Sequence, residues 1–145
     1  MTTNGGSGDG GVIFSFDPAS SIYAKLKDLV APDGIHPAGS LIQASDGKLY
    51  GMTSNYGQFN GAGVIFSFNP SSSIYTKLMD FNGTNGSNPL GSLIQASNGK
   101  LYGITSRGGS EFDGISHFGL GVIFSFDPST SYLYKAEGFR LYQRL

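Results

Sequence analysis

The chain of 145 residues contains no cysteine and no tryptophan, and only 13% of its residues are charged. Without cysteine it can form no disulfide, thiolate metal site or cysteine nucleophile. Nine basic residues stand against ten acidic ones, and the net charge of −1 argues against a nucleic-acid-binding surface. No apolar run is long enough to span a membrane as a helix, and no segment has the pattern of a signal peptide.

Glycine and aromatic residues are abundant instead: the chain has 23 glycines, and 13% of its residues are aromatic. Frequent Ser, Asn and Ile accompany them, while the apolar periodicity of an amphipathic helix is missing. This composition is typical of short β-strands joined by tight turns. The sequence therefore predicts an all-β protein.

The sequence also repeats itself. Gly-Val-Ile-Phe-Ser-Phe at 11–16 returns at 63–68 and again at 121–126. The segment 39–45 returns at 91–97, and Lys-Leu-Tyr-Gly at 48–51 returns at 100–103. A period of about fifty residues is the size of one blade of a β-propeller.

Each repeat is expected to form four antiparallel strands. In the second repeat these are 40–45, 48–54, 64–69 and 74–80, with turns at Asp46-Gly47 and Asn69-Pro70. We therefore predict a partial β-propeller of about 2.5 four-stranded blades, with a β-sandwich as the alternative. The predicted single domain spans 1–139, with a partial blade at 1–29, blades at 40–80 and 92–137, an insertion at 110–118 and an off-pattern tail at 140–145.

Three segments carry a family resemblance: the loop and strand at 82–96, the hairpin at 98–109 and the strand at 63–70. They resemble the GloVer tandem repeats of bacterial proteins that carry varied C-terminal surface anchors. The resemblance extends to about Tyr134 and implies a kelch-like propeller repeat on a secreted or cell-surface protein. It implies no reaction. Because the pattern starts within a unit and fades near the C-terminus, we expect a piece of a longer repeat protein or an open reading frame broken at both ends.

Candidate binding residues lie in the loops that precede the third strand of a unit. The insertion lengthens one such loop only, and long loops on a rigid repeat scaffold often bind ligands. Repeat loops also tolerate insertions freely, so sequence drift is the alternative. The candidates are Glu111, Phe112, Asp113, His117 and Phe118, together with Tyr56 in the corresponding loop of the preceding unit.

Catalysis is not expected. Asp17 is replaced by Asn69 in the next copy, which suits a turn residue but not a general acid or base. Neither His36 nor His117 has a partner at the spacing of a metal site or catalytic triad. No cofactor is expected, although the loops 33–37 and 85–89 offer oxygen ligands that would suit calcium.

The sequence thus predicts a non-catalytic repeat module that mediates protein or glycan interaction at the bacterial cell surface. The alternatives are a purely structural spacer and, less favoured, a fragment of a propeller hydrolase. The outer faces of the terminal units would expose Val, Ile and Phe side chains. We therefore expect the isolated chain to self-associate.

Overall fold

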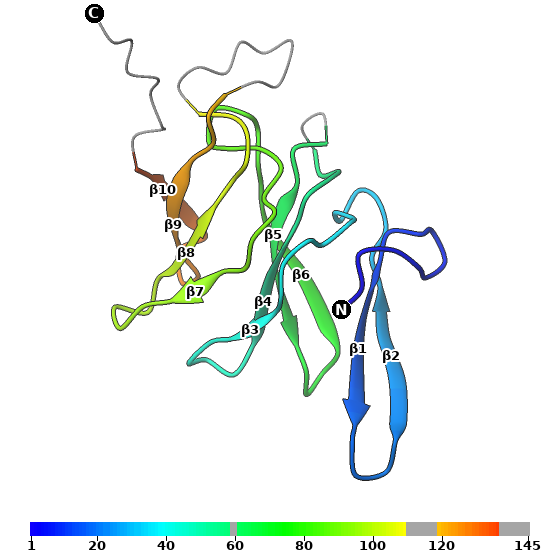
Figure 1. Cartoon of the computed structure of the whole chain (residues 1–145). Helices are drawn as coiled ribbons and strands as arrows, with labels where there is room; N and C mark the ends of the chain where they lie inside the picture. The colour runs from blue at the N-terminus through cyan, green and yellow to red at the C-terminus, as the bar shows by residue number, and fades with distance from the viewer. Residues whose placement is uncertain (59–60, 110–118, 137–145) are drawn as a thin grey trace, which may run out of the picture.

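The structure is a computed structural model and describes residues 1–58, 61–109 and 119–136. Figure 1 shows three β-sheets side by side, coloured blue, cyan to green, and yellow to orange along the chain. The described residues form ten strands and no helix, so none of them forms a helix that could span a membrane. The predicted all-β class is confirmed.

All neighbouring strands are antiparallel and follow one another in chain order within each sheet. The first sheet contains β1 (Val12–Asp17) and β2 (Ile22–Asp28). The second contains β3 (Ile42–Gln43), β4 (Leu49–Thr53), β5 (Val64–Asn69) and β6 (Ile74–Asp80). The third contains β7 (Ile94–Gln95), β8 (Leu101–Ile104), β9 (Ile123–Asp127) and β10 (Tyr132–Lys135).

Glycine fixes the hairpin that joins the first two strands of a unit. Gly47 and Gly99 have φ of 80° and 78°, in the left-handed region that a β-branched residue resists. The Gly47 amide donates to the Ala44 carbonyl at 2.9 Å, and the Ala44 amide donates to the Lys48 carbonyl at the same distance. This is a type I turn closed by a left-handed glycine, a common three-residue hairpin loop.

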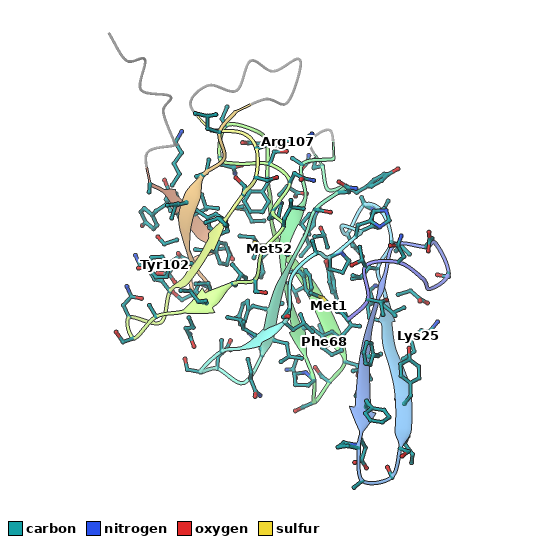
Figure 2. All side chains as sticks on the ribbon, viewed as in Figure 1. Met1, Lys25, Met52, Phe68, Tyr102 and Arg107 are labelled. Atoms are coloured by element: carbon teal, nitrogen blue, oxygen red, sulfur yellow. The ribbon has the colours of Figure 1, made fainter. Side chains whose placement is uncertain are left out.

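Strand β5 is buried on both faces. Its Val64, Phe66 and Phe68 side chains form one apolar cluster with Ile13 of the first sheet. Ile65 points to the opposite face, in a second cluster that extends into the third sheet. In Figure 2, Phe68 lies between the second sheet and the β1–β2 hairpin. The second sheet is therefore the middle layer of three.

Equivalent residues differ in exposure according to their neighbours. Phe68 is fully buried, whereas Phe16, at the same position of the first unit, is 55% exposed because no sheet in the described part of the chain covers that face. On the opposite face, Ile65 is fully buried and Ile123 is 43% exposed, since none of the described sheets covers that face of the third sheet. Burial of the repeated apolar residues thus depends on the stacking of units.

Backbone hydrogen bonds from the connecting loops tie the units together. The His36 amide donates to the Gly10 carbonyl of the first unit at 2.8 Å. The Ser54 amide of the second unit donates to the His36 carbonyl at 3.0 Å, and Ile35 pairs with Asn55. The backbone of His36 therefore hydrogen-bonds both to the glycine-rich loop of the first unit and to the residue that follows β4 in the second.

The second junction repeats these bonds. The Asn88 amide donates to the Ala62 carbonyl at 2.8 Å, and the Ser106 amide donates to the Asn88 carbonyl at 3.1 Å. His36 and Asn88 both have left-handed backbones, with φ of 55° and 53°. The two junctions are therefore the same structural element.

The contribution of stacking can be measured at matched positions. Phe68→Ala should lower the free energy of unfolding by about 3–5 kcal/mol, because it opens a cavity between two sheets. Phe16→Ala changes the same residue of the repeat on an uncovered face, and should cost less than about 1 kcal/mol. Chemical denaturation of both variants tests this, and equal losses would mean that stacking does not bury these rings.

Candidate functional site

Tyr56 is the sequence-predicted site residue that the structure describes. It lies in the loop between β4 and β5, is 51% exposed, and has a left-handed φ of 59°. The same position is Gly5 in the first unit and Gly108 in the third, with φ of 93° and 83°. An aromatic residue thus occupies a backbone position that suits glycine, and this conformation costs stability.

The other predicted binding residues lie outside the described part of the chain. They are Glu111, Phe112, Asp113, His117 and Phe118. The prediction that they form a binding loop therefore remains a prediction.

A polar groove lies between the second and third sheets, at the end where their hairpins turn. Its volume is about 400 Å³, and it is bounded by the β3–β4 turn, the β7–β8 turn and the β9–β10 turn. The polar side chains around it include the carboxylates of Asp46 and Asp127 and the amides of Gln95 and Asn98. These groups can donate and accept hydrogen bonds.

Gln95 joins the two hairpins at the groove. Its Oε1 accepts a hydrogen bond of 2.8 Å from the Ser45 amide of the neighbouring unit. Its Nε2 donates to the Ser45 hydroxyl at 3.3 Å and to the Gly99 carbonyl of its own hairpin at 3.1 Å. One side chain therefore sets the spacing of the two turns, so the groove exists only where two units meet.

Asp46 is held ionised by its neighbours. Desolvation acts to raise its pKa, but hydrogen bonds from the Tyr50 hydroxyl and the Lys48 amide outweigh this and lower the pKa below 3.8. The Tyr50 hydroxyl donates to Oδ2 at 2.8 Å, and the Lys48 amide donates to Oδ1 at 3.1 Å. Asp46 therefore carries a negative charge near neutral pH.

Asp127 is ionised for a similar reason. The Ser129 hydroxyl donates to its Oδ1 at 2.6 Å and the Ser129 amide at 3.0 Å, and these bonds lower the pKa of Asp127. A general acid that works near neutral pH needs a raised pKa. The two carboxylates therefore suit ligand binding better than proton donation.

The loops considered for calcium use their oxygen atoms within the protein. The Asp33 carbonyl accepts from the Tyr75 hydroxyl at 2.7 Å. The Asn85 Oδ1 accepts from the Asn82 amide at 2.8 Å, and the Asn88 Oδ1 accepts from the Ser106 hydroxyl at 2.9 Å. Among the described residues, no three or more His, Cys, Asp or Glu side chains gather in a way that could hold a metal ion.

His36 is not a freely solvated loop residue. Its Nδ1 lies 3.1 Å from the Thr3 carbonyl, and in the next unit the Asn88 Nδ2 donates to the Ser54 carbonyl at 3.2 Å. Because a carbonyl only accepts, Nδ1 of His36 must carry the proton. His36 and Asn88 therefore make the same contact between units.

Sequence reasoning missed the groove. Asp46, Asn98 and Asp127 each accept a hydrogen bond from the backbone amide two residues later, the usual role of Asp and Asn in turns. That local role explains their presence completely. Only the stacking of two units shows that three such turns face one groove.

The sequence matches a family model described as the Gloeobacter/Verrucomicrobia repeat over residues 1–143. No curated protein matches the chain.

The Tyr50–Asp46 hydrogen bond can be tested by acid titration. Tyr50→Phe removes one of the bonds that lower the pKa of Asp46, so this pKa should rise, as measured by NMR of the carboxyl carbon. A lowered pKa in the folded state gives stability that is present above the unfolded-state pKa and is lost as pH falls through the folded-state pKa. The difference in Tm between wild type and variant should therefore be largest at neutral pH and shrink in acid. A difference that stays constant would contradict this.

The strain at Tyr56 is also measurable. Tyr56→Gly should raise the free energy of unfolding by about 1 kcal/mol, because glycine relieves the left-handed conformation. Tyr56→Ala is the control, since it removes the ring but keeps Cβ and should give no gain. If both variants change the denaturation midpoint equally, the ring and not the backbone determines the effect.

Proposed function

Because this chain belongs to the Gloeobacter/Verrucomicrobia repeat family, we propose that it is a non-catalytic repeat module of a secreted or cell-surface bacterial protein. Its role is to bind a glycan in the polar groove between neighbouring units. The proposal rests on the groove itself, which lies between two hairpins that the Gln95 side chain joins by hydrogen bonds. The location outside the cell rests on the family resemblance.

The propeller architecture is part of this proposal. The two complete sheets approach closely at their first strands, where the Ser40 amide donates to the Ser92 hydroxyl at 2.8 Å and the Gly39 backbone lies against Gly91. Near β5 and β6, an opening of about 280 Å³ lined by Ile74 and Thr76 remains on the middle sheet. Close contact at the first strand of each sheet supports blades arranged around a central axis, and a β-sandwich is the alternative architecture.

The chemistry of the groove favours a glycan over a protein. The volume of the groove is within the range of small-ligand pockets. A stable protein interface is a broader surface, which buries about 800 Å² on each partner. Ionised Asp46 and Asp127 can accept charge-assisted hydrogen bonds from sugar hydroxyls. Asn98 adds an amide to the same groove.

A structural spacer is the second candidate. The observation in its favour is that both N–H donors of the Gln95 amide are used within the protein, in bonds to Ser45 and Gly99, and its Oε1 accepts from the Ser45 amide. In that case the groove residues would serve only to connect units. A binding experiment separates the two candidates.

A glycan array probed with the isolated chain should identify a bound class of glycan. Replacing both groove carboxylates, Asp46→Asn with Asp127→Asn, should then weaken binding by about tenfold or more through loss of charge-assisted hydrogen bonds. The fold should persist, because Asn98 and Asn69 occupy these positions in other copies. Calorimetry with the identified glycan gives the affinities.

Asp17→Asn is the matched control, because Asp17 makes the same turn bond in the first unit, away from the groove. It should leave the affinity unchanged. Binding that survives the double substitution would remove the groove as the site. A chain that binds no glycan would leave the spacer as the better account.

A further inference from the structure

The outer edge of β1 has no partner strand among the described residues. In the first sheet β1 pairs only with β2, and on its other side it makes a single bridge, between Thr2 and Val12. Beyond that bridge, the edge from Phe14 to Asp17 is open. An open strand edge is a template for another strand.

The other two units show what occupies this edge. In the second unit, β4 pairs with β5 from Val64 to Phe68, with Gly51 opposite Phe66 and Leu49 opposite Phe68. In the third unit, Gly103 of β8 lies opposite Phe124 of β9. Phe14 is the equivalent phenylalanine of the first unit, so the strand missing from β1 would place its glycine opposite Phe14.

Glycine is required at that place by the phenylalanine ring. A Cβ added to Gly51 would lie 2.6 Å from Cζ of Phe66, and one added to Gly103 would lie 2.6 Å from Cζ of Phe124. Contacts this short do not occur, so any other residue would have to displace the ring. The pairing therefore favours a partner strand that has glycine opposite the phenylalanine.

The last residues of such a strand are already present in the first unit. The Thr2 amide donates to the Val12 carbonyl at 2.9 Å, as the Thr105 amide does to the Val122 carbonyl. The Val12 amide in turn donates to the Thr2 hydroxyl at 3.1 Å. Met1 and Thr2 thus fix the register, and the vacant positions begin opposite Phe14.

We propose that the open edge of β1 is a strand-addition site for an extended segment from outside these 145 residues. The segment runs antiparallel to β1 and carries the Leu-Tyr-Gly sequence of the repeat, with its glycine opposite Phe14. The main chain supplies hydrogen bonds, and the glycine supplies the selectivity. Pairing of two β1 edges from two copies fits less well, because β1 (Val12–Asp17) contains no glycine to place opposite Phe14.

The site can be probed with a labelled peptide of sequence 40–51, Ser-Leu-Ile-Gln-Ala-Ser-Asp-Gly-Lys-Leu-Tyr-Gly. Fluorescence anisotropy with the full chain should show saturable binding, and hydrogen exchange should show new protection in β1. A peptide that ends in Val in place of the final Gly should bind about tenfold more weakly or worse. Equal binding of the two peptides, or protection elsewhere than β1, would overturn the proposal.

A compensating variant tests the role of the ring. Phe14→Ala removes the group that would collide with a side chain, so the preference for the Gly peptide over the Val peptide should fall to about threefold or less. Far-UV circular dichroism checks that the variant is folded. If the preference for the Gly peptide over the Val peptide does not fall, the Phe14 ring is not the group that discriminates between them.

A second experiment does not depend on the affinity of a free peptide. In it, the same segment is fused directly to Met1. The fusion that ends in Gly should raise Tm above that of the chain alone, and the fusion that ends in Val should not. Two fusions of equal Tm would reject the site even if a free peptide failed to bind.

Discussion

The burial of the third strand of each unit between two neighbouring sheets is the constraint on which the rest of the structure depends. In β5 the aromatic residues face one neighbour and Ile65 faces the other, so no solvent-facing side remains at its centre. A sheet with two apolar faces cannot be stable alone in water. The repeat therefore forms its core between units, and a single unit has no complete core of its own.

This constraint determines where glycine occurs in the second strand of a unit. The rings of Phe66 and Phe124 lie over the neighbouring strand, which leaves no room for a side chain at Gly51 or Gly103. The connecting loops then fix the spacing of the units, through His36 at one junction and Asn88 at the other. Two different side chains serve there because each donates to a carbonyl of the preceding unit.

The sequence predicts the fold of each unit well, and the contacts between units poorly. The predicted strands 64–69 and 74–80 agree with β5 and β6 because apolar alternation and the Asn69-Pro70 turn define them locally. The predicted strand 40–45 is shorter, since Ser40 and Ser45 bond sideways to the next unit and not to β4. The groove could not be predicted for the same reason: it forms between turns that are distant in sequence. The structure describes Tyr56 alone among the predicted binding residues.

A site of this kind belongs to a pair of units and not to one. The groove needs a hairpin on each side, and Gln95 closes it by bonding to Ser45 of the preceding unit. Gln43 holds the corresponding place in the second unit, where its Nε2 donates to the Gly47 carbonyl at 3.3 Å. The first unit, as described, has no hairpin to offer Gln43 an equivalent of Ser45. A strand added to β1 together with its hairpin would supply that equivalent. The open edge and the groove are therefore linked, because the contact that completes the first sheet would also create a second groove.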